Sequence, residues 1–281
     1  MRLGFVGVVF VFRIALRPSS ALVLTNFTGS IAMSVTLNIL GTVDAELARR
    51  IHDSRGPKPM SVTPLTLRGK VLWRGRHIIA PGEAVQFRVS ALGDVGVKLL
   101  DALDRTNEAR LFGVNARVEV LGAEVVRLGE LFSPGPSSFG VEFLSPIRFA
   151  RRRTMRRRRV KYEFCPNIEN IIKSTLNYWL RTIGDGEFRD WPRLLRWVYN
   201  YVYTRDIYGR VVSTKLPNSD QPQLGFIGRA EYEIRSKREG RIRQFWALMR
   251  LAELMNTGTT RSIGFGHIKI TSTKTKQAPR Q

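Results

Sequence analysis

Strand-like and helix-like segments follow one another in the first half of this chain in an order that few folds accommodate. The apolar run at 1–12 is typical of a buried strand, and apolar residues recur at helical spacing within 25–40. A second helix is expected to begin at Asp44, whose carboxylate can cap it, and to stop at a Gly-Pro turn. Further strands are predicted at 61–67, 70–74, 84–89, 117–121 and 141–144, with a helix at 96–103. This order, β-α-β-β-α-β with additions, predicts a ferredoxin-like domain.

The second half shows the same alternation without repeating the sequence. Helices are predicted at 167–180 and around 191–203, a strand at 226–235, and a helix from about 239, before a final loop and strand. In that last helix arginines lie opposite one apolar stripe, formed by Ile242, Phe245, Trp246, Met249 and Ala252. Composition changes near 145–146. We therefore predict an α+β protein with two tandem ferredoxin-like (RRM-like) domains and antiparallel sheets, 1–147 and 148–281.

The charge of the chain points to a polyanionic partner. It has 46 Lys and Arg residues against 23 Asp and Glu residues, a net charge of +23. Because 43% of the residues are hydrophobic, this excess lies on folded domains and not on a disordered tail. Residues 1–150 hold 18 basic and 12 acidic residues, whereas 151–281 hold 28 and 11. The second half is therefore the stronger candidate for binding RNA or DNA.

Cysteine and histidine are too sparse for a disulfide framework or a zinc site. There is one cysteine, and the three histidines at 52, 77 and 267 show no metal-ligand spacing. No metal and no cofactor is predicted, and the cytoplasm is the expected compartment. The apolar N-terminal run resembles a signal peptide, but Arg13 and Arg17 interrupt it, so we interpret it as a strand. It is also too short to span a membrane.

A glycine-rich segment at 255–270 combines a central arginine with a strand-like tail. Glycine lets backbone N–H groups approach a phosphate, and arginine offers a fork of donors to it. A mononucleotide P-loop does not fit, because here a helix precedes the loop and a strand follows it. The RNP1 strand of an RNA recognition motif is closer. However, His267 and Ile270 stand where RNP1 has aromatic residues, and 11 residues follow Ile270, too few for the helix and strand that must come after RNP1.

The third interpretation of the glycine-rich segment is a family resemblance. A helix, a loop with the cadence G-x5-GFG and a last strand follow a strand with the sequence GRAEYE. This arrangement resembles the glycine-rich loop of the RAMP superfamily, and within it the CRISPR repeat-processing endoribonuclease family. The segment ARRIHDSRGPKP at 48–59 and the segment FLSPI at 143–147 are also similar to that family. In the loop, Asn256 stands where members usually have another glycine.

The resemblance implies which residues bind and cut RNA. Members with this pattern have a histidine at the end of a short helix and a lysine after a Gly-Pro turn, which here are His52 and Lys58. Some members carry a catalytic tyrosine in the first helix, where this chain has Leu37. RNA-binding residues are expected in the glycine-rich loop and in an arginine run between the domains: Gly258, Thr260, Arg261, Ser262, Gly264, Gly266, Arg151, Arg152, Arg156 and Arg157.

RNA can be cleaved without a metal ion, because its own 2′-OH can attack the adjacent phosphorus. His52 could move the required proton as acid or base, and its place at a helix C-terminus favours the protonated imidazole. Lys58 would stabilise charge on the phosphate oxygens. The resemblance therefore implies a metal-independent endoribonuclease that cuts CRISPR precursor transcripts within repeats and leaves a 2′,3′-cyclic phosphate.

Two functions without catalysis remain open from the sequence. One is a RAMP subunit that binds guide RNA inside a CRISPR effector complex, and the other is a plain RNA-binding module. The expected partners are CRISPR repeat RNA and subunits of such a complex, with the chain as monomer or homodimer. A tyrosine cluster could stack on bases, but its neighbours Trp197 and Val198 favour a core position for Tyr199, Tyr201, Tyr203 and Tyr208.

Overall fold

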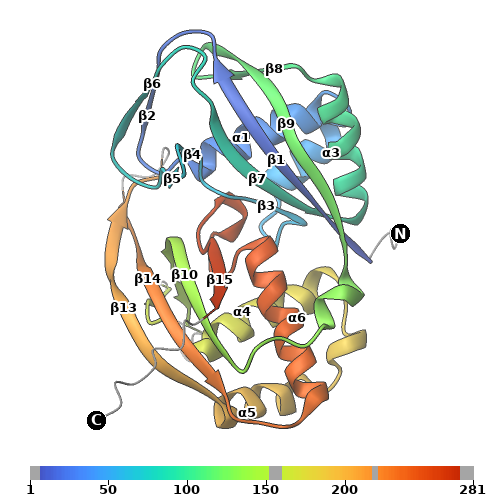
Figure 1. Cartoon of the computed structure of the whole chain (residues 1–281). Coiled ribbons are helices and arrows are strands. Elements are labelled where there is room, and N and C mark those ends of the chain that lie inside the picture. Colours follow the sequence, from blue (N-terminus) through green and yellow to red (C-terminus); the bar gives the residue numbers. More distant parts are fainter. Residues whose placement is uncertain (1–6, 152–159, 217–220, 273–281) are drawn as a thin grey trace.

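A computed structural model describes residues 7–151, 160–216 and 221–272. It shows two α+β domains, which lie one above the other in Figure 1. The elements of the first domain, in chain order, are β1 (Val8–Pro18), β2 (Leu22–Thr25), α1 (Gly29–Gly41), α2 (Ala45–Asp53), β3 (Met60–Val62), β4 (Thr66–Leu67), β5 (Lys70–Val71), β6 (Arg76–Ile79), β7 (Val85–Leu92), α3 (Gly93–Arg105), β8 (Glu108–Leu111) and β9 (Val114–Arg127).

The first sheet has the strand order of a ferredoxin-like fold. Its central strand, β1, pairs antiparallel with β7 on one side and with β9 on the other. Strands β3 and β4 pair with the free side of β7, which gives the order second, third, first, fourth for the four basic strands. The predicted β-α-β-β-α-β order is therefore confirmed. A separate pair, β2 with β6, and strand β8 are additions that the sequence patterns did not predict.

Short-range sequence signals correctly predicted the first two helices of the first domain. Apolar side chains at helical spacing in α1, Ile31, Val35 and Ile39, are buried in the core. Helix α2 begins after Asp44, whose Oδ1 accepts a hydrogen bond of 2.9 Å from the Leu47 N–H. This cap satisfies one of the free N–H groups of the first turn, as predicted. Helix α2 therefore begins at a defined residue, and it ends at Asp53, next to His52.

The second domain repeats the same topology. Its elements are η1 (Leu128–Phe132), β10 (Ser138–Ile147), β11 (Phe149–Ala150), β12 (Tyr162–Glu163), α4 (Ile168–Thr182), η2 (Gly186–Phe188), α5 (Trp191–Tyr201), β13 (Val202–Thr214), β14 (Gln223–Ile234), α6 (Glu239–Met255), η3 (Arg261–Ile263) and β15 (Ile268–Ser272). The sheet order is β13-β14-β10-β15, again second, third, first, fourth. The fold class of two tandem ferredoxin-like domains is confirmed.

Strand β10 lies in the second domain, whereas the sequence-based boundary at residue 147 placed it in the first. The strand pairs with β14 and β15, so it opens the second domain and does not close the first. Its alternate side chains Phe139, Val141 and Phe143 are buried in the second core. The fourth strand of the first domain is β9 alone, and the sheets divide between Arg127 and Ser138. The sequence pattern identified the strand, but its partners lie about 80 to 130 residues further along the chain.

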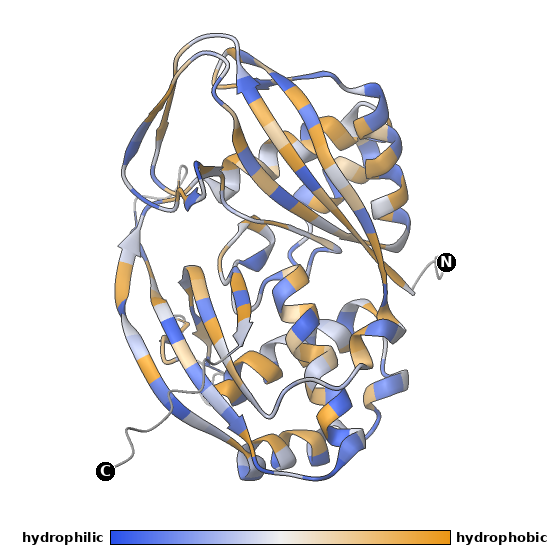
Figure 2. Ribbon diagram, viewed as in Figure 1, coloured by the Kyte–Doolittle hydropathy of each residue, from blue (hydrophilic) through white to orange (hydrophobic). Residues whose placement is uncertain are grey.

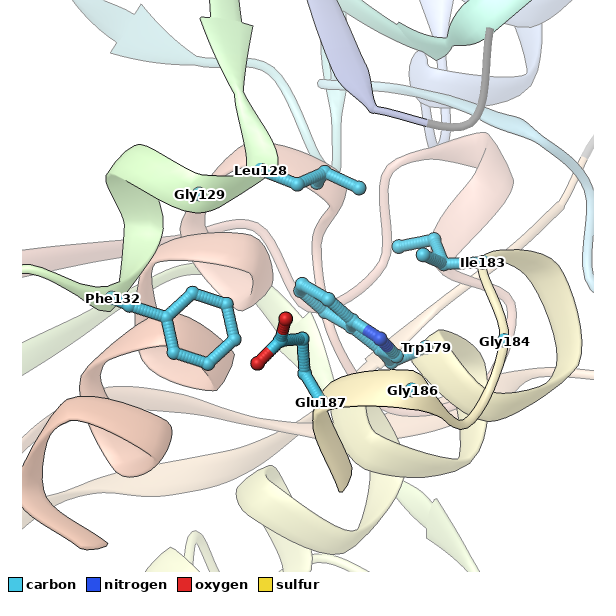
Figure 3. Close-up of a pocket in the computed structure, with 8 residues that line it drawn as sticks. All are labelled: Leu128, Gly129, Phe132, Trp179, Ile183, Gly184, Gly186 and Glu187. Carbon is cyan, nitrogen blue, oxygen red and sulfur yellow. The ribbon is translucent and has the colours of Figure 1, made fainter. Parts of the chain in front are cut away.

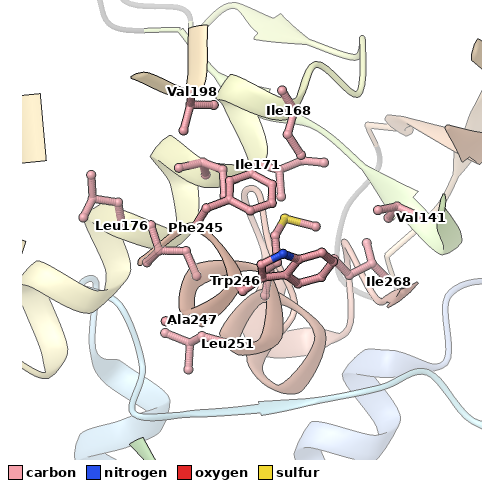
Figure 4. Packing of buried hydrophobic residues seen from close by; sticks show 14 of the residues in the cluster. Val141, Ile168, Ile171, Leu176, Val198, Phe245, Trp246, Ala247, Leu251 and Ile268 are labelled. Atoms are coloured by element: carbon pink, nitrogen blue, oxygen red, sulfur yellow. The ribbon is translucent and has the colours of Figure 1, made fainter. Parts of the chain in front are cut away.

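Helix α6 lies at the centre of the second core. Phe245, Trp246, Met249 and Ala252 are buried there, so the predicted apolar stripe is confirmed. Figure 4 shows Phe245 and Trp246 among residues of α4 such as Ile171. Of the arginines opposite the stripe, Arg243 is exposed, whereas Arg241 and Arg250 bond to other segments of the domain. Arg241 bonds to Asp190 at 2.7 Å, and Arg250 donates to the carbonyls of Leu131 and Ser133. These arginines hold neighbouring segments of the same domain.

The long strand β13 forms the edge of the second sheet. It pairs only with β14 among the described strands, and nine consecutive residues, 203–211, are exposed. Tyr203 and Tyr208 on this strand are therefore exposed. Tyr199 in helix α5 is exposed as well, and the prediction that these tyrosines lie in the core is wrong for all three. An edge strand has a neighbour on one side only, which no local pattern reveals.

Hydrophilic and hydrophobic residues succeed one another along the strands of both sheets, as Figure 2 shows. This pattern is typical of sheets with one face on a core and the other in water. Among the described residues, no helix has the length and apolar character needed to cross a membrane.

Candidate active site

His52 lies at the exposed end of helix α2. Its side chain is 74% exposed, so an RNA strand can reach the imidazole. Nδ1 lies 3.0 Å from Oδ1 of Asp53. Because an ionised carboxylate only accepts hydrogen bonds, Nδ1 carries the proton in this contact and Nε2 is left for a ligand. Asp53 is a residue that the sequence reasoning did not assign.

Lys58 is held against the end of the same helix. Its Nζ donates to the carbonyl of Ile51 and, at 2.7 Å, to the carbonyl of His52. Carbonyls in the last turn of a helix have no partner within the helix, and a cation stabilises the negative end of the dipole. Partial burial lowers the pKa of Lys58, while the charge of Asp53 acts in the opposite direction. The structure thus brings His52 and Lys58 together.

The position of the tyrosine that some family members carry is occupied here by a core residue. Leu37 in α1 is 9% exposed and belongs to the first hydrophobic core. A tyrosine does lie near Lys58, but it comes from the second domain. Tyr178 of α4 is buried, and its hydroxyl donates to the carbonyl of Lys58 at 3.1 Å. Burial raises the pKa of Tyr178 well above its ordinary value, so it stays protonated at neutral pH.

The glycine-rich loop connects α6 to β15 and lies between the two domains in Figure 1. Its glycines are in close contact with other backbone segments. A Cβ at Gly258 would lie 2.6 Å from the Arg148 carbonyl oxygen, one at Gly264 would lie 2.9 Å from Pro64, and one at Gly266 would lie 1.8 Å from the Thr257 carbonyl oxygen. All three have positive φ angles, of 82°, 94° and 65°. Packing within the protein therefore requires glycine at each position.

Asn256 explains how this loop does without the additional glycine. Its φ angle of 57° and ψ angle of 173° form a combination that is found almost only in glycine, so the contacts of Asn256 must hold it there. Its buried side chain donates from Nδ2 to the Val62 carbonyl at 2.8 Å and to the Arg261 carbonyl at 3.0 Å. The first bond crosses to strand β3 of the first domain. Asn256 therefore fastens the loop to the other domain, a role that glycine cannot perform.

Arg261 at the apex of the loop is turned toward the protein. Its guanidinium carbon lies 3.2 Å from the centre of the Tyr178 ring. Burial lowers the pKa of Arg261 to about 10, so it remains charged at neutral pH. Its Nη1 is buried and has no hydrogen-bond partner among the described residues. The guanidinium thus meets an aromatic face in a site with little access to water.

A second arginine, Arg148, supports the loop and was not singled out from the sequence. It is 6% exposed and donates to the hydroxyl oxygens of Thr259 at 3.2 Å and of Thr260 at 3.3 Å. Its guanidinium carbon also lies 4.2 Å from the centre of the Tyr162 ring. Ser262, also predicted to bind RNA, is partly exposed. The sequence signal that could have identified Arg148 was its position directly after strand β10.

The arginine run falls mostly outside the described part of the chain. Arg151 is exposed and pairs with Glu163 at 3.3 Å, whereas Arg152, Arg156 and Arg157 lie outside the described residues.

The other two histidines are separate from the candidate site. His77 Nε2 bonds to the Arg74 carbonyl at 2.9 Å, and His267 has a buried Nδ1 without a partner among the described residues. Burial, together with the charge of Arg88, lowers the pKa of His267 to about 3. Within the described ranges, no three side chains of His, Cys, Asp or Glu are grouped so that they could hold a metal ion.

A pocket of about 500 Å³ lies elsewhere in the second domain. Figure 3 shows the rings of Phe132 and Trp179 in it, with the carboxylate of Glu187 between them. None of the site residues predicted from the sequence lines this pocket. It therefore does not form part of the candidate active site.

Comparison with known proteins gives both a sequence match and a set of fold matches. The model of the family "CRISPR-associated endoribonuclease Cas6" matches residues 141–268. No curated protein matches the chain in sequence. Among solved structures, a product complex of Cas6 (TTHB231) from Thermus thermophilus is 18% identical, with a TM-score of 0.71 over 92% of this chain and 98% of that one.

Two further solved structures have the same fold. A product complex of Cas6 (TTHA0078) is 20% identical, with a TM-score of 0.67 over 94% of this chain and 100% of the other. The product of a Cas6-related gene from Pyrococcus furiosus is 14% identical, with a TM-score of 0.60 over 95% and 100%. At such identities the likeness establishes the fold.

The tandem ferredoxin-like domains, with a glycine-rich loop before the last strand of the second, also have the fold of a solved structure described as a RAMP protein binding different RNA substrates, which is 12% identical with a TM-score of 0.58 over 93% of this chain and 100% of that one. Residues 141–268, most of the second domain, match the Cas6 family in sequence, and the chain as a whole has the fold of solved Cas6 structures. The family resemblance predicted from the sequence is thereby confirmed.

Proposed function

We propose that this protein is an endoribonuclease that cuts CRISPR precursor transcripts within their repeats to give guide RNAs. The reaction needs no metal ion and leaves a 2′,3′-cyclic phosphate. The observation that carries this proposal is the geometry of His52, an exposed imidazole oriented by Asp53 beside the ammonium group of Lys58.

The chemistry requires one proton to leave and one to arrive. The RNA 2′-oxygen gives its proton to a water molecule and bonds to phosphorus, while the bond from phosphorus to the 5′-oxygen breaks and that oxygen gains a proton. His52, protonated on both ring nitrogens, supplies that proton from Nε2, since Nδ1 is engaged by Asp53. The imidazole then takes up a proton from solvent. Lys58 stabilises the negative charge that develops on the phosphate oxygens. An ammonium has three donors and two bond to α2 carbonyls, so one remains for the phosphate.

Two further findings support RNA repeats as the substrate. The Cas6 proteins with the same fold include structures of product complexes and of a substrate mimic complex. The net charge of +23 favours a polyanionic ligand, and such binding weakens with salt.

The decisive experiment is cleavage of repeat RNA in EDTA. We expect cleavage by the wild type to persist in EDTA, and a single 2′-deoxy substitution at the cut site to abolish it. The 5′ product should carry a 2′,3′-cyclic phosphate, which mass spectrometry detects as a loss of water relative to the linear phosphate. Dependence of cleavage on added Mg²⁺ would contradict the mechanism. Tight binding of repeat RNA without any cleavage would instead assign the protein as a guide-binding subunit.

A further inference from the structure

The segment between α2 and β3, residues 54–59, carries Lys58 and begins two residues after His52. It has no regular secondary structure and is exposed at 54–56. Within the first domain, Lys58 Nζ ties it to the end of α2 through the carbonyls of Ile51 and His52. A segment of this kind needs further contacts to keep two reacting groups in one geometry.

The second domain supplies one of these contacts. The Tyr178 hydroxyl in α4 donates to the carbonyl of Lys58 at 3.1 Å. Tyr178 is 2% exposed, so its ring cannot move without disturbing the core. The bond therefore fixes the backbone of Lys58 to a rigid helix of the other domain.

The glycine-rich loop in turn covers Tyr178. The Arg261 guanidinium carbon lies 3.2 Å from the centre of the tyrosine ring, and the Arg261 carbonyl accepts a hydrogen bond from Asn256 Nδ2 at 3.0 Å. Asn256 also donates to the Val62 carbonyl in β3, the strand into which the 54–59 segment runs. A continuous set of contacts thus leads from the loop through Arg261 and Tyr178 to Lys58.

We propose that Tyr178 and Arg261 are positioning residues of the cleavage reaction, through which the glycine-rich loop sets the place of Lys58 and, with it, of His52. This inference rests on the proposed function of the His52 and Lys58 site. It assigns to the loop a role in cleavage that is separate from contact with RNA.

Four variants test the inference. Tyr178→Phe keeps the ring under Arg261 and removes only the hydroxyl bond to Lys58. Its matched control is Tyr232→Phe, since Tyr232 is also fully buried and its hydroxyl donates to a backbone carbonyl, that of Pro166. Arg261→Lys keeps the charge and removes the planar group. Its control is Arg250→Lys, since Arg250 is partly buried and lies over the ring of Trp246.

Two measurements are needed for each variant. The first is the single-turnover cleavage rate at saturating RNA, with the dissociation constant of the RNA measured separately. We expect Tyr178→Phe and Arg261→Lys to lower the rate roughly tenfold, while the dissociation constant changes less than about twofold. The second is the rate at which trypsin cuts after Arg55 in the protein without RNA. We expect both variants to be cut several times faster than the wild type and the two controls.

The two measurements separate the inference from the function on which it rests. If the wild type does not cleave RNA, the proposed function fails, whereas the trypsin rates still show whether Tyr178 and Arg261 hold the segment. Equal trypsin rates in the variants and their controls would overturn the inference. So would faster trypsin cutting with an unchanged RNA cleavage rate, because the segment would then be held without effect on the reaction.

Discussion

The guanidinium of Arg88 in strand β7 donates a hydrogen bond of 2.5 Å to the carbonyl of Glu253 in the last turn of helix α6. A second bond, of 3.2 Å, goes to the carbonyl of Leu254. The first domain thereby caps the C-terminal end of the central helix of the second domain, where a cation is most favourable. Burial lowers the pKa of Arg88 to about 10, so it is still charged at neutral pH. The two domains therefore stabilise each other through this contact.

Replacement of Arg88 should destabilise the whole protein. We expect Arg88→Met to lower the free energy of unfolding by about 1.5–3 kcal/mol, because the carbonyls of α6 lose a charged donor in a buried place. Urea unfolding followed by circular dichroism measures this change. Arg110→Met is the control, since Arg110 is exposed on strand β8 and should change stability little. Equal stability of the two variants would show that the cap contributes nothing.

His267 should make the protein sensitive to mild acid. Its pKa is about 3 in the folded protein and near 6.5 when unfolded, so the unfolded chain takes up the proton first as the pH falls. Stability from this group is complete above pH 6.5 and is lost between 6.5 and 3. Between pH 7 and pH 5 the wild type should lose about 2 kcal/mol more than His267→Gln. Urea unfolding at both pH values measures this difference, and His77→Gln should keep the wild-type loss.

The glycines of the loop should matter for stability in the absence of RNA. Gly266→Ala would place a Cβ 1.8 Å from the carbonyl oxygen of Thr257, so we expect a loss of more than about 3 kcal/mol. Gly69→Ala is a matched control, because Gly69 has a φ of 77° with no atom within 4 Å. It should lose only about 1–2 kcal/mol, the cost of left-handed backbone. If both variants lose equal stability, the loop can move away from Thr257.

His52→Ala should impair cleavage without impairing binding. Loss of a proton donor typically lowers a rate by about 10²–10⁴-fold, and we expect a fall within this range in single-turnover cleavage. The dissociation constant for repeat RNA should change little, because an exposed imidazole is one contact among many. His77→Ala provides the comparison and should cleave at the wild-type rate. A similar fall in both variants would remove the special role of His52.

Local sequence signals predicted much of the fold. The Asp44 cap, the helical spacing of Ile31, Val35 and Ile39, and the stripe on α6 all act within a few residues, and each lies where it was expected. The exposed tyrosines of β13 were predicted wrongly, because such local signals do not reveal which strands lie at the edge of a sheet. Their sequence suits a core, and only the sheet shows that β13 is an edge strand with one neighbour.

The residues of the candidate site were also predicted only in part. Sequence similarity pointed to His52 and Lys58, which the structure places together because they lie six residues apart, at the end of one helix. It could not show Tyr178, which is 120 residues from Lys58 and belongs to the other domain. The same holds for Asn256, which is 194 residues from its partner Val62.

The sequence by itself determined the basic β-α-β-β-α-β order of the first domain, the charge that suits a nucleic acid, and the family resemblance, because periodicity, composition and short motifs are all properties of neighbouring residues. Only the tertiary structure decided that β10 opens the second domain, that Arg261 lies on Tyr178, and that the glycines of the loop are packed against backbone. Such contacts join residues far apart in the chain, and they depend on how two cores pack together, which no local pattern specifies.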